Sequence, residues 1–219
     1  MADQLTLGML GGTGPQGKGL ALRLATAGHQ ILLGSRNAER AASVAAELLD
    51  GRDLPIKGLA NAEAAAGADV VFLVFPFEGQ AAMLPDLADA IGDKLVVDVI
   101  NPLGWDERGA FVLDVPEGSA AEQAAALLPD SRVVAAFHHV SAVLLLDPEV
   151  ESMDLDVLVL GDDRAATDLV QALAARITGV RGVYAGRLRN CAQIEALTAN
   201  LVSINRRYKA HAGIRITDL

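Results

Sequence analysis

The hydrophobic residues of this chain fall into short runs that alternate with longer, Ala-rich segments of mixed polarity. The runs at 69–75 and 95–100 are almost uninterrupted, which is typical of strands buried on both faces of a sheet. The repeated order of strand, helix and strand predicts a doubly wound, mainly parallel α/β fold. We expect strands at 5–10, 31–33, 56–59, 69–75, 95–100, 132–137, 155–161 and 179–184.

The segments between and after these strands have the length and periodicity of helices. The longest, at 190–211, follows the last strand and carries apolar residues on one face, as an amphipathic helix does. A turn at 147–149 divides the chain into a domain at 1–148 and a smaller α/β domain at 149–219, which ends in this long helix. We expect the other helices at 18–27, 38–49, 61–67, 78–91, 117–128 and 164–177.

A glycine-rich turn joins the first strand to the first helix. Its spacing, Gly12-x-Gly14-x-x-Gly17, is that of the dinucleotide fingerprint, in the strand–turn–helix–strand context that the fingerprint requires. The first glycine permits the tight turn, the second lets a pyrophosphate approach the backbone, and the third lets the helix pack closely. The N–H groups at the helix N-terminus then face the phosphates. The sequence therefore predicts a dinucleotide-binding Rossmann domain at 1–148.

The tip of the second strand carries the residues that distinguish NADP from NAD. NAD-binding domains have an Asp or Glu in this region, which accepts a hydrogen bond from the ribose 2′-OH. This chain has Ser35 and Arg36 instead, and Arg40 follows one helical turn later. A hydroxyl and two guanidinium groups attract a 2′-phosphate that a carboxylate would repel. Ser35 or Asn37 could also cap the following helix. The pattern predicts NADP(H).

Composition and charge limit the partners. A net charge of −10 argues against nucleic acid or an anionic membrane as the main partner. No apolar run reaches the roughly 18 residues of a membrane span, and residues 1–4 lack the basic region of a secretory signal. The single cysteine, Cys191, excludes an intrachain disulfide, and we expect a cytoplasmic protein. The last fifth is nevertheless basic, as either an anion site or a solvated face: Arg176, Arg181, Arg187, Arg189, Arg206, Arg207, Lys209 and Arg215.

Residues of chemical interest also follow the later strands. Phe77 lies where the ligand crevice is expected and is either a cofactor contact or part of the core. Asp98 interrupts an apolar strand, where a carboxylate must be paired or near the sheet edge. His138 and His139 point in opposite directions on an extended chain and have no further ligand beside them, so we expect no metal site. One of the two histidines could contact a ligand or assist a proton transfer.

The most specific block of sequence is 11–25, together with Gly28-His29 and Gly34-Ser35-Arg36. Weaker matches continue as far as Glu195-x-Leu197-Thr198 in the last helix. Together these segments resemble the NADPH-dependent reductases of coenzyme F420, a deazaflavin hydride carrier, over nearly the whole chain. The turn Pro15-Gln16 departs from the family's Asn-Leu type, and 138–141 departs from its His-Thr-Ile-Pro pattern.

The resemblance implies an oxidoreductase that transfers hydride between NADP(H) and coenzyme F420, usually as a homodimer, with the domain at 149–219 on the deazaflavin side. It implies no catalytic acid or base, because hydride transfer between two rings depends on positioning; His138 is the one candidate. The anionic tail of F420 would suit the basic last fifth. The expected cofactor-binding residues are Gly12, Thr13, Gly14, Pro15, Gln16, Gly17, Ser35, Arg36, Arg40, Phe77, Leu103, Val140 and Ala142.

Two other functions fit the same cofactor. An NADP-dependent imine or carbonyl reductase also uses a Rossmann domain with a helical C-terminal part. The short-chain version needs Tyr-x-x-x-Lys, but Leu188 follows Tyr184 at that spacing and Ala212 follows Tyr208. A non-catalytic NADP-sensing protein is the third reading.

Overall fold

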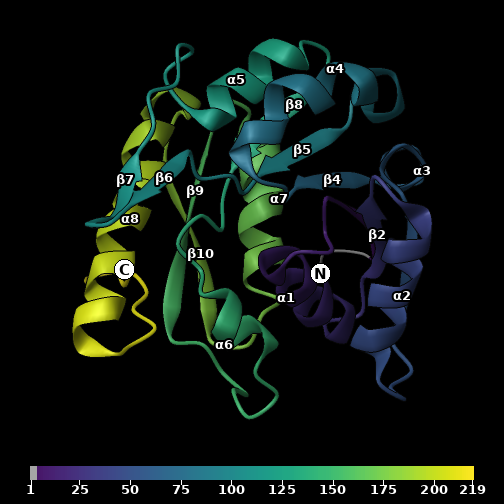
Figure 1. Ribbon diagram of the computed structural model, residues 1–219, viewed down its shortest axis with the longest axis horizontal. Coiled ribbons are helices and arrows are strands. Elements are labelled where there is room, and N and C mark those ends of the chain that lie inside the picture. Colours follow the sequence, from purple (N-terminus) through teal and green to yellow (C-terminus); the bar gives the residue numbers. More distant parts are fainter. Residues whose placement is uncertain (1–3) are drawn as a thin grey trace.

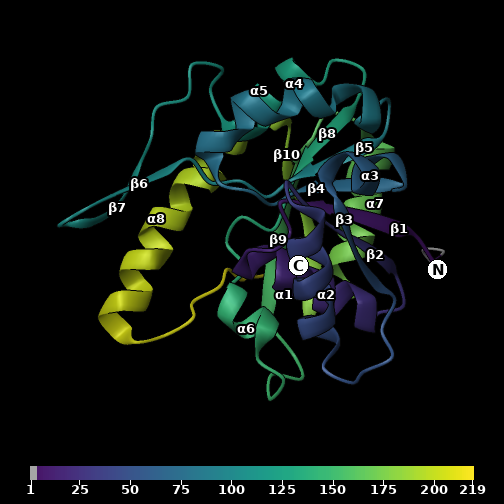
Figure 2. The same cartoon turned by 45° about the vertical axis from the view of Figure 1, so that its right-hand side comes forward.

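The computed structural model describes residues 4–219 and contains an eight-stranded sheet with helices on both faces (Figures 1 and 2). Its order is β10-β9-β8-β5-β4-β1-β2-β3, and all neighbours are parallel except β8 and β9. This is the predicted doubly wound fold. The strands are β1 (Thr6–Leu10), β2 (Gln30–Ser35), β3 (Ile56–Ala60), β4 (Val70–Leu73), β5 (Leu95–Asp98), β8 (Arg132–Ala135), β9 (Leu155–Gly161) and β10 (Val180–Gly186).

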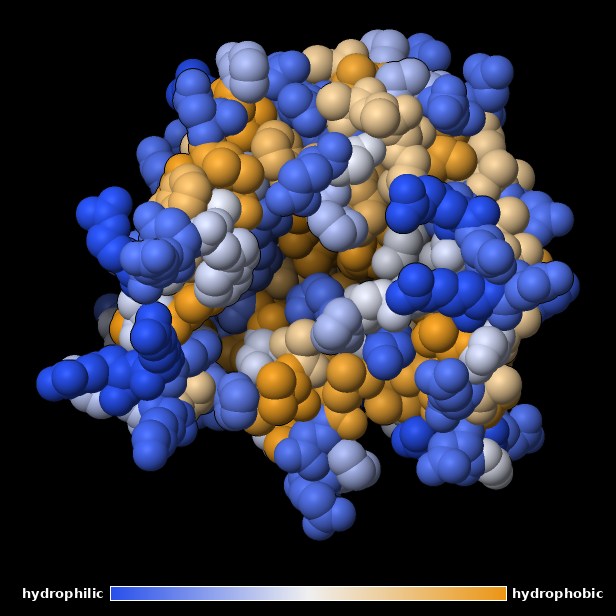
Figure 3. Space-filling view, viewed as in Figure 1, coloured by the Kyte–Doolittle hydropathy of each residue, from blue (hydrophilic) through white to orange (hydrophobic). Residues whose placement is uncertain are grey.

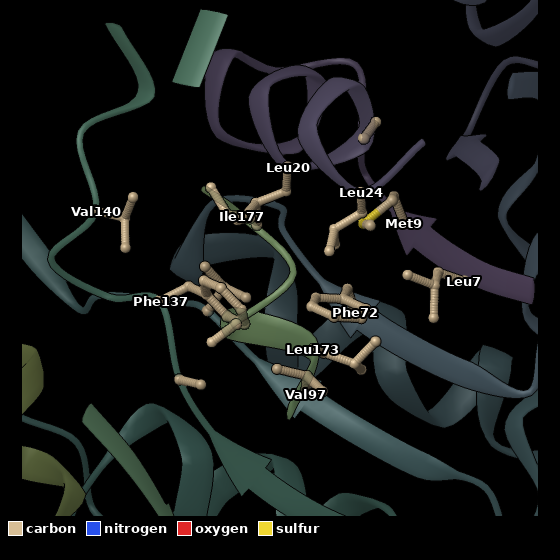
Figure 4. Packing of buried hydrophobic residues seen from close by; sticks show 14 of the residues in the cluster. Leu7, Met9, Leu20, Leu24, Phe72, Val97, Phe137, Val140, Leu173 and Ile177 are labelled. Atoms are coloured by element: carbon tan, nitrogen blue, oxygen red, sulfur yellow. The ribbon is translucent and has the colours of Figure 1, made fainter. Parts of the chain in front are cut away.

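Two hydrophobic cores lie on opposite faces of the sheet. Side chains of α1, α2, α6 and α7 fill one, and those of α3, α4, α5 and α8 contribute to the other. Figure 4 shows the first core, where Leu20 and Leu24 of α1 pack near Met9 of β1 and near Phe72 of β4. The helices are α1 (Pro15–Thr26), α2 (Ala38–Leu49), α3 (Asn61–Ala66), α4 (Gln80–Ile91), α5 (Ala120–Leu127), α6 (Ala142–Leu146), α7 (Arg164–Ala174) and α8 (Cys191–Tyr208), with single 3₁₀ turns at Phe77–Gly79 and Leu188–Asn190.

Two elements were not expected from the sequence. The segment after β5 forms an antiparallel hairpin of β6 (Leu103–Asp106) and β7 (Gly109–Val112). Asp106 closes its turn, because one carboxylate oxygen accepts the N–H groups of Arg108 and Gly109. The short helix α6 follows Ser141, whose side chain accepts the N–H of Leu144. Both elements are short, and neither has the long apolar pattern on which the prediction relied.

The strands after residue 148 extend the same sheet. β9 pairs antiparallel with β8, and β10 pairs parallel with β9. The sheet therefore runs across residue 148. The division into domains at 1–148 and 149–219 stays a prediction. The chain then turns into α8, which begins at Cys191, close to the expected start, and ends at Tyr208 rather than at 211. None of the helices in residues 4–219 has the length and hydrophobicity that a membrane span requires.

The C-terminal residues are fastened to β9 by one buried carboxylate. Arg181 on β10 donates to both oxygens of Asp156, at 2.6 and 2.7 Å, and Arg215 donates at 3.2 Å. The backbone N–H of Ile216 adds a bond of 2.6 Å to the same carboxylate. The hydrogen bond from Arg181 is the main reason that the pKa of Asp156 falls from 3.8 to about 2. Arg181 and Arg215, two of the basic residues of the last fifth, therefore share this carboxylate as a partner.

Replacing Asp156 by Ala should lower the free energy of unfolding by about 1–3 kcal/mol at pH 7, because Arg181 keeps partial contact with water when the carboxylate is lost. Since folding lowers this pKa, the contribution is complete above about pH 4 and is lost as the pH falls toward 2. Urea unfolding at pH 7 and pH 3 measures both values. Arg164→Ala, which removes an exposed pair with Asp168, is the control and should change little. An equal difference between wild type and D156A at both pH values would contradict the assignment.

Candidate functional site

A large cleft lies at the carboxyl edge of the parallel strands. The strand order reverses between β1 and β4, and ligands of open α/β sheets bind outside such a switch point. The cleft measures about 730 Å³ and is lined by the glycine-rich turn and by the segments that follow β2, β4, β5 and β8. On the face drawn in Figure 3 the surface is hollowed near the centre, with hydrophobic residues in its depth. This is the candidate site.

The glycine-rich turn brings helix α1 close to β1 and β2. A side chain on Gly17 would put its Cβ 2.5 Å from the Cα of Gly12, so only glycine permits this contact. Gly12 donates its N–H to the carbonyls of Met9 and Gly34, at 3.0 Å each. A Cβ added at Gly14 would meet no atom within 4 Å, so the backbone there lies open to the cleft. The α1 N-terminus, with Pro15 in its first turn, therefore faces a space where an anion fits.

Asn61, the first residue of α3, supports this turn and was not identified from the sequence. Its side-chain oxygen accepts the N–H of Gly11 at 3.1 Å, across 50 residues of chain. Asn61 is buried and also lines the cleft. Gly11 has a φ of +72°, a conformation that favours glycine. Its N–H is paired by a side chain from another element, the Asn61 amide. The only sequence signal was an Asn at the start of a predicted helix.

One end of the cleft is basic. Ser35, at the end of β2, lines it together with Arg36 and Arg40. Asn37 caps α2, since its side chain accepts the N–H of Arg40 at 2.9 Å, and Ser35 accepts the N–H of Asn37 at 3.3 Å. The capping function thus falls to Asn37 and leaves both arginine side chains for the cleft. The three side chains thus lie at one end of the cleft, and their contact with a 2′-phosphate stays a prediction.

The other end of the cleft is built from the segments that follow β5 and β8. Asn101 donates to the carbonyl of His138 at 2.8 Å, and Thr198 of α8 lies 3.3 Å from the same carbonyl. Gln16 donates to the carbonyl of Phe137 at 3.4 Å. Phe137 has a φ of +65°, an unfavourable conformation for a bulky residue, and its ring packs against Phe72 with centroids 6.0 Å apart (Figure 4). The strained turn therefore fixes the backbone of His138 at this end.

Four ionisable side chains lie buried behind this end: Asp98, His138, Cys191 and Glu195, here called the buried quartet. The Nε2 of His138 is 3.8 Å from the Oδ1 of Asp98. The Sγ of Cys191 donates to Glu195 at 3.2 Å. Burial raises the pKa of the Asp98 and Glu195 carboxyls, and burial together with the nearby Glu195 raises the pKa of the Cys191 thiol. Cys191 is accordingly a thiol at neutral pH.

The two histidines have different environments. The imidazole of His138 is 0% exposed, so this residue lines the cleft through its backbone, and its part in proton transfer stays a prediction. His139 accepts the N–H of Leu158 at 3.4 Å, and burial lowers its pKa to about 4. It is therefore uncharged at neutral pH and ties the loop to β9. Ligand atoms of His138, Cys191 and Glu195 come within 4.8 Å of one another, but the expected absence of a metal is untested.

The expected cofactor residues divide into two groups. One group lines the cleft and the other does not. Gly12 and Gly17 belong to the second group and shape the glycine-rich turn, and Leu103, Val140 and Ala142 also lie outside the lining. Of those three, Val140 is buried in the core, whereas Leu103 begins β6 and Ala142 begins α6. Residues that the sequence did not single out also line it, among them Val99, Ile100 and Met83. The expected residues in its lining are Thr13, Gly14, Pro15, Gln16, Ser35, Arg36, Arg40 and Phe77.

Comparison with known proteins agrees with this geometry. Residues 6–102 match the family described as "NADP oxidoreductase coenzyme F420-dependent". An F420-dependent NADP reductase of Methanothermobacter marburgensis is 44% identical over 98% of this chain and 99% of its own length. One from Methanocaldococcus jannaschii is 40% identical, again over 98% and 99%. A solved structure from Arthrobacter sp. FB24 is 25% identical, with a TM-score of 0.84, and the match covers 97% of this chain and 99% of that one.

The sheet order and the glycine turn at its switch point define a Rossmann-fold dinucleotide-binding protein. Identity of 40–44% over nearly the full length of both chains narrows the class to one family. The chain belongs to the family of the F420-dependent NADP reductases.

Arg36→Ala should weaken NADP⁺ binding by about 10- to 100-fold, because a charge-assisted phosphate contact contributes roughly 1.5–3 kcal/mol. Binding of NAD⁺, which lacks the 2′-phosphate, should change little. Dissociation constants from titration calorimetry measure both. Arg52→Ala is the matched control, because Arg52 lies beyond the other end of α2 and donates to the carbonyl of Leu48. Equal losses for NADP⁺ and NAD⁺ would show that Arg36 does not contact the 2′-phosphate.

Proposed function

We propose that this chain is an oxidoreductase that transfers hydride between NADP(H) and coenzyme F420. Its membership of the family of F420-dependent NADP reductases carries the proposal. The cleft supports it, because a basic end, a glycine turn and a partly apolar end follow one another in the order that NADP requires.

We assign the successive parts of the cleft to the parts of NADP(H). Ser35, Arg36 and Arg40 hold the 2′-phosphate, and the turn at 13–16 holds the pyrophosphate at the N-terminus of α1. The nicotinamide then lies at the far end, against the segments at 99–101 and 137–138. Phe77 lies along the ribose. Leu103, Val140 and Ala142, expected with Phe77 to flank the ribose and nicotinamide, lie outside the lining of the cleft and stay a prediction.

The chemistry that the two coenzymes supply is hydride transfer between carbon atoms of two rings. The protein has to hold those rings face to face and exclude water, so no catalytic acid or base is required. Asn101, with its amide hydrogen-bonded to the His138 carbonyl, fixes the wall on one side. The anionic tail of F420 can reach Arg206, Arg207 and Lys209, which are exposed at the end of α8.

Turnover tests this proposal directly. Mixing the protein with NADPH and oxidised F420 should bleach the visible absorbance of the deazaflavin, and NADP⁺ with reduced F420 should restore it. NADH in place of NADPH is the control and should react much more slowly, because it lacks the 2′-phosphate. Tight NADPH binding without turnover would favour an NADP sensor. Oxidation of NADPH by imines or ketones, but not by F420, would favour the other reductase class.

We also propose that the protein is a cytoplasmic homodimer that needs neither nucleic acid nor a membrane. Support for the dimer comes from a projecting arm formed by the β6–β7 hairpin and the second half of α8 (Figures 1 and 2). Large apolar side chains on this arm face solvent, notably Trp105 at 66% and Tyr208 at 72% exposure, with Phe111, Val112 and Ile204 nearby in the same elements. Exposed apolar groups of this kind mark protein–protein contacts.

Trp105→Glu should convert the dimer to a monomer in size-exclusion chromatography with light scattering, because it places a charge in an apolar contact. NADPH affinity should be retained, since Trp105 lies outside the cleft. Tyr184→Glu, at another exposed aromatic position, on β10, is the control and should leave the dimer intact. A wild-type protein that is monomeric at tens of micromolar would refute the dimer without affecting the hydride-transfer proposal.

A further inference from the structure

The buried quartet joins three layers of the fold at one point. Asp98 ends β5, His138 follows β8, and Cys191 and Glu195 belong to the first turns of α8. Glu195 also accepts the N–H groups of Ala120 and Ala121 at the start of α5, at 2.9 and 3.1 Å. The charged or polar groups around the quartet include Glu122 on α5 and His139 beside His138, and Gln80 on α4 donates to the carbonyl of Ala120.

Stability alone does not explain this group. In residues 4–219, the Oδ2 of Asp98 and both ring nitrogens of His138 are buried without a hydrogen-bond partner, and so is the Oε1 of Gln80. Each such atom costs free energy, and apolar side chains of similar size usually stabilise a core better than buried charges do. A buried carboxyl with a free oxygen atom, such as that of Asp98, is retained more readily where its charge acts on something nearby.

The nearest open space is the far end of the cleft. Asp98 directly precedes Val99, Ile100 and Asn101, which line it, and its Oδ1 accepts the N–H of Ile100 at 3.0 Å. The backbone of His138 lines the same end, while its imidazole faces Asp98. The quartet is thus the layer behind the wall against which the proposed function places the nicotinamide.

Only one redox form of that ring is charged. The nicotinamide of NADP⁺ is a cation, and the dihydronicotinamide of NADPH is neutral, whereas the phosphates are common to both. A buried charge behind the wall of the cleft acts on the ring more strongly than a charge in water would, because few water molecules lie between them to screen it. The quartet has two carboxyls and one imidazole, so its excess charge is negative once the carboxyls are ionised.

We propose that Asp98 and Glu195, together with His138, are positioning residues that make the site favour the oxidised over the reduced nicotinamide. They do not touch the cofactor; they set the electrostatic potential at the wall that it contacts. The inference rests on the proposed function, which supplies the cofactor and its orientation. By favouring bound NADP⁺ over bound NADPH, these residues would influence the direction of hydride transfer.

The same coupling acts in reverse. A cationic ring beside the wall favours the deprotonated carboxyls, so rising pH must strengthen NADP⁺ binding relative to NADPH. Ionisation of Asp98 and ionisation of Glu195 both change the potential in this direction. Titration of the 2′-phosphate cancels in the ratio, because both forms carry it.

The test is the ratio of dissociation constants, Kd(NADP⁺)/Kd(NADPH), measured from pH 6 to pH 9. Asp98→Asn should raise this ratio by about 4- to 15-fold at the pH where the difference is largest. That range corresponds to unit charges roughly 10 Å apart at an effective dielectric constant of about 20 to 40. Glu195→Gln should act in the same direction, and the wild-type ratio should fall as the pH rises. Asp69→Asn, the same change at the opposite edge of the sheet, is the control and should leave the ratio unchanged.

Three results would overturn the inference while leaving the proposed function intact: an unchanged ratio in both variants, an equal loss of both nucleotides, or stoichiometric zinc in the purified protein. Zinc would neutralise the carboxylates and make the quartet a metal site. If the variants do not fold, a pH-independent ratio in the wild-type protein overturns it as well. Failure to bind either nucleotide would remove the proposed function and this inference together.

Discussion

The close contact between Gly17 and Gly12 is the constraint on which the rest of the site depends. It lets α1 begin directly above the end of β1, so that the N-terminus of the helix points into the cleft. A side chain on Gly17 would push the helix away and move its N–H groups out of the cleft, and one on Gly12 would collide with Met9 and Leu33 of the strands. Asn61 then fixes the preceding residue, Gly11, from the other side of the sheet. The geometry of the candidate phosphate site therefore depends on the backbone more than on charged side chains.

The elements that the sequence predicted well are those whose signal is local. Uninterrupted apolar runs identified the strands of the sheet, and the expected helix at 38–49 agrees with α2 at both ends. The hairpin at 103–112 and the short helix α6 were missed, because they bury few residues and have no clear period. The expected helix at 117–128 begins at Ala120 instead, since Ser119 caps it by accepting the N–H of Glu122. Capping residues decide boundaries that apolar periodicity leaves open.

The candidate site was predictable only where its residues are adjacent in sequence. The glycine turn and the Ser35–Arg36 pair were found because spacing alone defines them. Asn61 and Gly11 are 50 residues apart, and Glu195 reaches Ala120 across 75 residues, so neither contact has a local signature. Asp98 was recognised as unusual in an apolar strand, but its neighbours His138, Cys191 and Glu195 come from other elements. Contacts of this kind depend on sheet order, which sequence patterns specify weakly.

Helix α8 connects the far end of the cleft to the exposed arm. Its first turns are held in the core by Glu195 at the start of α5 and by the buried Cys191. Its second half leaves the core, so that Ile204 is 40% exposed. One amphipathic pattern therefore serves two surfaces, an internal one and an exposed one. Because the two halves of α8 lie in different surroundings, substitutions on the arm leave the buried quartet and the far end of the cleft in place.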